Sequence, residues 1–337
     1  MNYKISLLDQ SPVLNQESNE ATLARTVKLA QGAEKLGYHR FLVSEHHNSS
    51  EVAGSSPEVL VSYLLAKTEK IRIGSGGVML QHYSPYKVAE NFNVLASLAG
   101  DRVDLGIGKA PGGLPLSTKA LQYKKFSTEN DFYERLSLLN QFINNTVPEN
   151  HEFAELKAAP IPKVKPEIIL LGASRGSAED AAKLGISFAY AQFFNSNDEE
   201  LEAAVKAYRE HFPTGRFILG VNVIASIDEE KAKDFAAGQT LYKVHLASGK
   251  RLTLVTEEQA EKLGRESGES FTIEKHEPNV ISGTPVQIKE KLDELHTKYG
   301  VDEFIYHTPV LNEEVRNESF QLISPTNLEK LGIPLKI

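Results

Sequence analysis

Short apolar runs alternate with helical stretches along the whole chain. Between residues 71 and 107, one apolar run (71–80) leads into a helical stretch (85–99) and then into a second apolar run (103–107). A strand, a helix and a strand in this order are typical of a parallel sheet with a crossover helix. The same pattern predicts strands over residues 3–8, 40–44, 71–80, 103–107, 168–171, 187–192, 217–225 and 303–306.

Helical stretches stand between these strands. Gly37 is a typical helix stop, and Pro285 after Thr284 is a typical helix start. Eight strands and eight helical stretches without a linker predict an α/β fold, a single (β/α)8 TIM barrel over residues 1–337. The predicted helices cover residues 19–36, 57–67, 85–99, 131–144, a stretch that begins near 175–177, 198–211, 228–237 and 284–299, and a broken helical segment covers 312–330.

Two segments depart from the repeating pattern. Residues 111–128 have little periodicity, and we expect a long loop over the barrel mouth. Residues 238–282 are polar and interrupt the repeat between the seventh and eighth strands, although 256–265 could be helical. The segment is predicted to be an insertion that acts as a lid. A surface excursion without a role is the alternative.

Composition narrows the classes of function. The chain carries 37 Lys and Arg against 45 Asp and Glu, a net charge of −8, and it has no basic stripe, which disfavours a nucleic-acid partner. It has no cysteine, which excludes disulfides, thiolate catalysis and cysteine-ligated metals. No apolar run approaches the ~18 residues of a membrane helix. With no export signal before the first strand, we expect a cytoplasmic protein.

Glycines gather late in two predicted strands. Gly74, Gly76 and Gly77 lie toward the end of the third strand, and Gly106 and Gly108 toward the end of the fourth. A glycine normally weakens a strand, so each needs a reason. Missing side chains at strand ends would leave room for a flat ligand to lie against the backbone. Bulges or tight packing are the alternative.

The second strand delivers Glu45, His46 and His47 at its C-terminal end, where barrels of this class carry their chemistry. A neutral imidazole with a pKa of ~6.5 can accept a proton near neutral pH. A purely structural strand end is the alternative. A metal site is disfavoured, because adjacent histidines on a strand point to opposite faces.

The segment GASRGSAEDAAKLG follows the fifth strand. A helix that begins near residues 175–177 leaves its first backbone N–H groups unpaired beside the hydroxyls of Ser174 and Ser177 and the charge of Arg175. Such an arrangement suits a phosphate group. Ordinary serine N-capping explains the same residues equally well.

Four motifs together resemble the bacterial luciferase-like monooxygenase family, alkanal-type flavin enzymes with a TIM barrel. The resemblance runs over residues 3–225 and resumes at 283–295. Each motif alone would be a weak signal, but their order and their positions at strand ends make the set specific. The motifs are SEHH (44–47), GSGGVMLQHYSPYKVAE (74–90), DRVDLGIGKAPGG (101–113) and LLGASRGSAEDAAKLG (171–185).

The resemblance implies roles for particular residues. His46 matches the family histidine that stands beside the flavin and supports proton transfer or the oxygenated flavin. Gly76 and Gly77 match a non-prolyl cis peptide that lies against the flavin ring. Lys109 stands where many relatives have an arginine for the flavin phosphate, and it lacks the bidentate fork of arginine.

The resemblance also implies a phosphate-binding segment after the fifth strand. Ala173, Ser174 and Ser177 match it, and Arg175 lies within it and could add charge. Luciferase itself has a cysteine near the flavin where this chain has Gly108, and a tryptophan where this chain has Gln192. We include Gly108 among the expected cofactor-binding residues. Light emission on a long-chain aldehyde is therefore not predicted.

The sequence thus predicts an enzyme that binds reduced FMN, reacts with O2 and oxygenates a small organic substrate. An apolar group of the substrate is expected beside Tyr83, Phe193 and Phe194. No second dinucleotide fingerprint is present, so a separate NAD(P)H:flavin reductase is expected to supply the reduced flavin. The family usually forms dimers, and we expect a homodimer.

Two other functions stay open. One is hydride transfer with a deazaflavin coenzyme, which a related branch uses in the same barrel. A reduced deazaflavin would hardly react with O2, whereas a reduced flavin would react quickly. The other is a non-catalytic flavin-binding protein, for which a His46→Ala variant would behave like the wild type.

Overall fold

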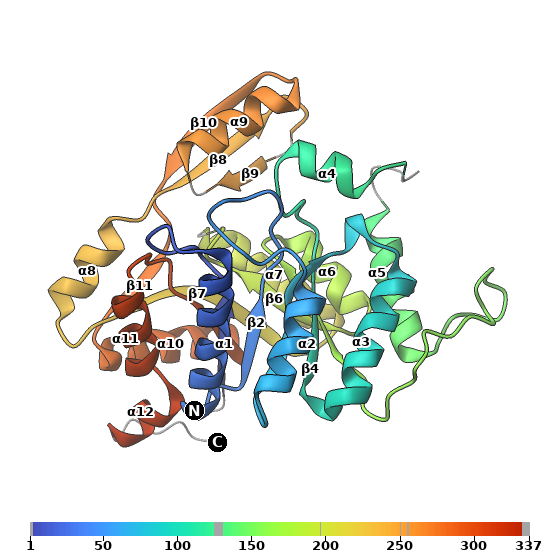
Figure 1. Cartoon of the computed structure of the whole chain (residues 1–337), viewed down its shortest axis with the longest axis horizontal. Helices are drawn as coiled ribbons and strands as arrows, with labels where there is room; N and C mark the ends of the chain where they lie inside the picture. Colours follow the sequence, from blue (N-terminus) through green and yellow to red (C-terminus); the bar gives the residue numbers. More distant parts are fainter. Residues whose placement is uncertain (1–2, 125–130, 196, 250, 255, 332–337) are drawn as a thin grey trace.

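In the computed structural model, which describes residues 3–124, 131–195, 197–249, 251–254 and 256–331, parallel strands close into a barrel (Figure 1). The last barrel strand pairs with both the first and the seventh, which completes the ring. The predicted (β/α)8 TIM barrel is therefore confirmed. Its eight strands are β1 (Lys4–Asp9), β2 (Arg40–Val43), β3 (Arg72–Met79), β4 (Val103–Gly108), β5 (Glu167–Gly172), β6 (Ser187–Ala191), β7 (Phe217–Ala225) and β12 (Glu303–His307).

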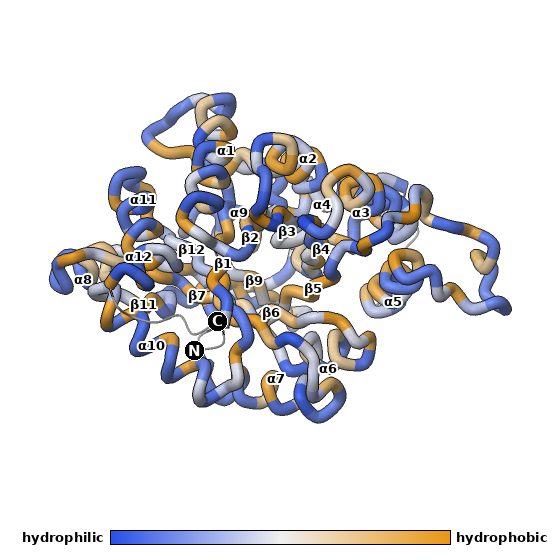
Figure 2. The backbone as a smooth tube through the Cα atoms, turned by 90° about the horizontal axis from the view of Figure 1, so that it is seen from below, coloured by the Kyte–Doolittle hydropathy of each residue, from blue (hydrophilic) through white to orange (hydrophobic). Residues whose placement is uncertain are grey.

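Helices surround the strands, as the end-on view in Figure 2 shows. Several begin at the residues that the sequence marks. Ser18 caps the first helix, and Thr284 and Gln287 form a capping box at the tenth. The helices and 3-10 turns around the barrel are α1 (Asn19–Lys35), α2 (Pro57–Lys67), η1 (Leu80–His82), α3 (Pro85–Ala99), η2 (Gly100–Arg102), α4 (Pro115–Leu121), α5 (Phe132–Asn144), α6 (Arg175–Lys183), α7 (Asp198–His211), α8 (Glu229–Ala237), α10 (Pro285–Tyr299), α11 (Glu313–Leu322) and α12 (Pro325–Lys330).

The barrel interior is layered because alternate residues of each strand point inward. Its middle layer is apolar and consists of buried side chains that pack on one another. The middle layer includes Leu8, Leu42, Ile169, Ala189, Ile218 and Ile305.

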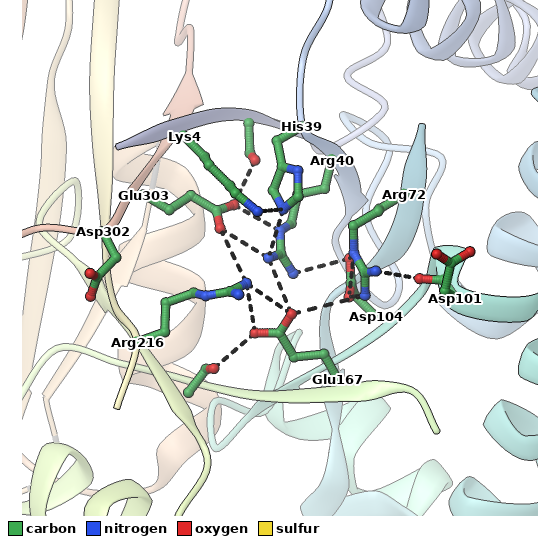
Figure 3. Close-up of polar contacts among 12 residues, drawn as sticks. Lys4, His39, Arg40, Arg72, Asp101, Asp104, Glu167, Arg216, Asp302 and Glu303 are labelled. Carbon is green, nitrogen blue, oxygen red and sulfur yellow. Dashed lines mark hydrogen bonds and ion pairs between the residues drawn. The ribbon is translucent and has the colours of Figure 1, made fainter. Parts of the chain in front are cut away.

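Charged side chains close the opposite, N-terminal end of the barrel (Figure 3). Arg40 is fully buried, and its guanidinium lies 2.7 Å from Glu303 Oε1, 3.0 Å from Asp104 Oδ2 and 3.3 Å from Glu167 Oε2. Burial lowers the pKa of Arg40, but these carboxylates outweigh burial and raise it overall. The open end of the barrel is therefore the C-terminal one.

A separate small sheet lies between β7 and β12. Its strands β8 (Leu241–Leu246), β9 (Arg251–Leu254) and β10 (Phe271–His276) are antiparallel, and α9 (Glu257–Ser267) packs on them. Leu114 packs against the core of this sheet, and Gln259 Nε2 donates to Glu51 Oε2 at 2.9 Å. The predicted insertion and its helix are thus confirmed, and they lie over loops at the C-terminal end of the barrel (Figure 1).

Three local predictions need correction. The segment 111–128 is not entirely a loop, because α4 forms within it from a proline at its first turn; residues 125–128 lie outside the described part. The end of the predicted insertion also contains a strand that was not predicted, β11 (Val280–Gly283), which pairs with the C-terminal half of β7. Finally, β2 ends at Val43, so the argument that adjacent histidines on a strand diverge does not apply to His46 and His47.

No helix within the described ranges is both long enough and apolar enough to cross a membrane.

Candidate active site

The strand register gathers most of the predicted site residues at the barrel mouth. Val43 at the end of β2 pairs with Ser75, which directly precedes Gly76 and Gly77. Farther along the sheet, Gly108 at the end of β4 pairs with Met79 on one side and with Leu171 on the other. The SEHH segment, the glycines of β3 and β4, and the start of α6 therefore follow one another around a single edge.

Glu45 connects three of these segments. It is fully buried, and its Oε1 accepts hydrogen bonds from His47 Nε2 and from the Tyr83 hydroxyl, both at 2.7 Å. Its Oε2 accepts from the backbone N–H of Met79 at 2.9 Å. A carboxylate with three donors is well compensated for its burial. Glu45 thus holds the end of β2 against the end of β3 and the turn that follows it.

His46 stands beside this network in a half-buried position. Its backbone N–H donates to Gly54 O at 2.8 Å, and its Nδ1 lies 3.1 Å from the hydroxyl oxygen of Ser44. Burial is the largest cause that lowers the pKa of His46 from 6.5 to about 4, and His47 adds to the shift. The imidazole is therefore neutral at pH 7 but a weaker proton acceptor than its ordinary pKa suggests.

The glycines of β3 and β4 have two different environments. A Cβ on Gly74 would lie 2.5 Å from Asp104 O, and one on Gly77 would lie 2.8 Å from Gly106 O. Close strand packing, the alternative considered from the sequence, therefore accounts for these residues. Gly108 instead faces the flexible thioether of Met79, whose sulfur would lie 3.0 Å from a Cβ added to this glycine. The peptide bond between Gly76 and Gly77 is cis.

The start of α6 combines features of both interpretations of its sequence. Ser174 is the N-cap, and its hydroxyl accepts from the backbone N–H of Ser177 at 3.3 Å. The backbone N–H of Arg175 donates to Glu200 Oε1 of α7 at 3.0 Å, while the Arg175 side chain pairs with Glu179. Serine capping is therefore present, and a carboxylate already occupies one of the helix donors.

This end of α6 also has the chemistry that suits a phosphate. A Cβ added to Gly176 would have no neighbouring atom within 4 Å, so the first turn of α6 is open on that side. The hydroxyls of Ser174 and Ser177 lie 3.1 Å apart. Lys109 is exposed, and its ammonium lies 5.7 Å from the centre of the Phe132 ring. Its charge opposes the rise that burial causes in the pKa of Asp180 in α6. Backbone N–H groups, hydroxyls and a cation fit a dianionic group.

A small apolar recess lies within the barrel, among the buried residues of its interior. Phe193, one of the three aromatic residues expected beside the substrate, lines it. The other two lie elsewhere: the Tyr83 hydroxyl is bound to Glu45, and Phe194 is 43% exposed. The lining residues are Leu8, Leu42, Leu171, Ala189, Tyr190, Ala191, Phe193, Gly220 and Ile305.

Two pairs at the mouth were not assigned a role from the sequence. His307 Nδ1 lies 2.9 Å from Asn222 Oδ1, and Arg316 Nη2 lies 2.7 Å from Asp9 Oδ1. Their positions, His307 at the end of β12 and Asn222 in the C-terminal half of β7, were the signal in the sequence that could have pointed to the first pair. Among the described residues, no group of three His, Cys, Asp or Glu side chains could hold a metal ion.

Comparisons with known proteins show the family of this chain. The family model for luciferase-like monooxygenases matches residues 1–303. The N-acetyl-S-alkylcysteine monooxygenase of Bacillus subtilis (strain 168) is 44% identical over 95% of this chain and 97% of its own. The crystal structure of apo-MsnO8 is 30% identical, with a TM-score of 0.77 over 98% of this chain and 99% of that one. The chain belongs to the luciferase-like monooxygenase family, an enzyme family, as its motifs predicted.

More distant structures share the fold alone. The oxygenating constituent of 3,6-diketocamphane monooxygenase from Pseudomonas putida, in complex with FMN, is 17% identical, with a TM-score of 0.70 over 97% of this chain and 98% of that one. An F420-dependent secondary alcohol dehydrogenase is 13% identical, with a TM-score of 0.64 over 97% and 99%. The barrel is thus used with both a flavin and a deazaflavin.

Proposed function

We propose that this protein is a monooxygenase that uses reduced FMN and O2 to oxygenate a small organic substrate. The observation that carries the proposal is the gathering of His46, the Gly76–Gly77 backbone and the open start of α6 at the C-terminal ends of neighbouring barrel strands. Membership of the luciferase-like monooxygenase family supports the same function independently. Reduced FMN would supply two electrons, so that one atom of O2 enters the substrate and the other leaves as water.

The chain's own residues then have distinct roles toward FMN. The hydroxyls of Ser174 and Ser177, the N–H groups after Ala173 and the charge of Lys109 would hold the phosphate. Arg175 would add positive charge only if it leaves Glu179. The backbone of Gly76 and Gly77, and that of Gly108 beside the flexible Met79 side chain, would lie against the ring system.

His46 would act as a neutral hydrogen-bonding group beside the reacting atoms. Its lowered pKa favours donation and acceptance of hydrogen bonds over storage of a proton at pH 7. The recess in the barrel interior presents hydrocarbon side chains, which would exclude water from the part of the substrate that enters it. Glu45 holds the histidine segment in position through its three hydrogen bonds.

An N-acylated amino acid with an S-alkyl group is the first substrate to test. The name of the 44% identical relative suggests it. The recess is apolar and about the size of one water molecule, so it has room for the terminal methyl of such an alkyl group. Hydride transfer with a deazaflavin coenzyme is the second candidate, which the shared fold of the F420-dependent dehydrogenase supports.

We also propose partners and a moving part. A cytoplasmic NAD(P)H:flavin reductase would deliver the reduced flavin. A second copy would pack on α2 and α3, where large apolar side chains lie exposed. The insertion would act as a lid, because it rests on the mouth loops through Leu114 and Gln259; hydrogen exchange in residues 241–276 should slow when FMN and substrate are added. The exposed side chains on α2 and α3 are Val59, Tyr63, Val94 and Leu98.

The direct test is turnover under 18O2 with FMN, NADH, a flavin reductase, catalase and N-acetyl-S-alkylcysteine. We expect one labelled oxygen atom in the oxidised product or in a fragment released from it. His46→Ala should lower turnover by at least about a hundredfold with FMN binding intact. Flavin binding without any labelled product across a panel of thioethers would favour the non-catalytic binder instead.

A further inference from the structure

The ends of β7 and β12 place two polar side chains inside the barrel mouth. His307 pairs with Asn222 in the register of these strands. Because side chains alternate along a strand, His307 shares the inner face with Ile305, and Asn222 shares it with Ile218. Both isoleucines belong to the buried apolar layer of the barrel interior. His307 and Asn222 therefore stand directly above that layer, and Ile305 below His307 lines the apolar recess.

The hydrogen bonds of Asn222 fix the tautomer of His307. The Asn222 Nδ2 donates to Asn279 O at 3.3 Å, so its Oδ1 is the atom that faces the ring, 2.9 Å from His307 Nδ1. A carbonyl oxygen only accepts, and Nδ1 must therefore carry the hydrogen. The lone pair is left on Nε2. No hydrogen bond from Nε2 is found to any residue in the described part of the chain.

The surroundings keep this imidazole neutral. Burial is the main reason why the pKa of His307 falls from 6.5 to about 4, and the positive charge of Arg316 adds to it. Asp9 opposes the shift, but its carboxylate is already bound to Arg316 and Thr26. A charge on His46 would also lower the pKa of His307.

Phe193 connects His307 to the recess. Its ring centroid lies 6.0 Å from that of His307, and its side chain lines the recess together with Ile305. A molecule with an apolar group in the recess would thus have a hydrogen-bond acceptor above it. Because the neighbouring strand already fixes the tautomer of His307, no binding free energy is spent on orienting this acceptor when the ligand binds.

We propose that His307 is a substrate-positioning residue whose Nε2 accepts a hydrogen bond from an amide N–H of the substrate, while the substrate's apolar group lies against Phe193 with its terminal methyl in the recess. The substrate class of this proposal is a small secondary amide that carries a short apolar group a few bonds away. An N-acylated S-alkyl amino acid has both features. This inference rests on the proposed function and adds the residue that selects the amide.

The test compares N-acetyl-S-alkylcysteine with its N-methyl analogue, which lacks the amide hydrogen. Methylation should lower kcat/KM of the wild type by about ten- to a hundredfold, mainly through KM. In His307→Leu, kcat/KM for the N–H compound should fall by the same factor. N-methylation of the substrate should then lower the kcat/KM of this variant by less than about threefold. His307→Gln, whose amide oxygen can accept, should recover part of the discrimination. His151→Leu, a histidine in the loop between α5 and β5, is the matched control and should behave as wild type.

Two further readouts separate positioning from a structural role. Nitrogen-15 NMR should report the Nδ1–H tautomer for His307 in the wild type and a mixture in Asn222→Leu, which should also lose discrimination. FMN titration should give the same affinity for all variants. Full N–H discrimination in a folded His307→Leu protein would overturn the inference.

If the wild type oxidises neither compound, the proposed function fails, and calorimetric binding of the two compounds decides the inference alone. The inference would be supported if the wild type bound the N–H compound at least about tenfold more tightly than the N-methyl compound and His307→Leu did not. Equal or undetectable binding would overturn it.

Discussion

The carboxylate of Glu200 on α7 accepts a hydrogen bond from the backbone N–H of Arg175 in the first turn of α6, with 3.0 Å between Oε1 and N. A negative charge therefore lies at the helix end where we propose that the flavin phosphate binds. A carboxylate and a phosphate compete for the same donor and repel each other.

This contact predicts that Glu200 weakens FMN binding. Glu200→Gln should bind FMN about two- to fivefold more tightly, since the interaction of a charge with a helix terminus is about 0.3–1 kcal/mol. Fluorescence titration of FMN measures the change. Glu199→Gln, an exposed neighbour on the same helix, should leave the affinity unchanged. Weaker binding in Glu200→Gln would mean that Glu200 positions α6 and does not compete.

The charged layer at the N-terminal end of the barrel predicts a large effect on stability. Arg40→Met would remove the buried cation that Glu303 and Asp104 share and leave them only their outer partners, Arg216 and Arg72. Loss of one partner from a buried ion pair typically costs about 3–5 kcal/mol. Urea unfolding followed by circular dichroism gives the free energy. Lys206→Met, which removes an exposed pair with Glu210 at 3.8 Å, should change it by less than about 0.5 kcal/mol. A loss below about 1 kcal/mol in Arg40→Met would contradict the role of this layer in stability.

The buried position of His46 predicts an unusual titration. NMR of its ring protons should give a midpoint at a pKa of about 4, far below the 6.5 of an exposed histidine. The unfolded chain takes up the proton near 6.5, so His46 favours unfolding progressively as the pH falls from 6.5 toward 4. The same signals in urea provide the unfolded reference. A folded-state midpoint near 6.5 would restore His46 as a proton acceptor at neutral pH.

The exposed apolar side chains of α2 and α3 predict a dimer. Leu98 is 77% exposed and Tyr63 is 54% exposed, on helices that contact each other. Sedimentation velocity should give a dimer for the wild type and a monomer for Tyr63→Lys combined with Leu98→Lys. Leu311→Lys, at a leucine 67% exposed elsewhere, should remain dimeric. A monomeric wild type at micromolar concentration would refute the interface.

The barrel could be predicted because its elements have strong local patterns. All nine residues of β7 (Phe217–Ala225) are buried, and their apolar run indicates a strand covered on both faces. The helix α4 has only seven residues, too few to show a period. Strands β8 and β10 carry many half-exposed polar residues, so their segment resembled a polar excursion.

The contacts of the site could be predicted only in part. Motifs located His46 and the start of α6, since they depend on neighbours in the chain. The pairs that set the chemistry join distant residues: Tyr83 and Glu45 are 38 positions apart, and His307 and Asn222 are 85 apart. The pKa of His46 likewise depends on burial by segments that meet only in the folded barrel. No local pattern encodes such distances.

The central claim is that this protein controls the reaction of reduced FMN with O2. The most direct measurement mixes anaerobic protein and photoreduced FMN rapidly with oxygenated buffer and follows flavin absorbance. We predict a slow phase in which the spectrum belongs to neither reduced nor oxidised flavin, followed by oxidised flavin. Oxidation with the same time course as free reduced FMN would contradict the claim and direct the next experiment to the deazaflavin coenzyme.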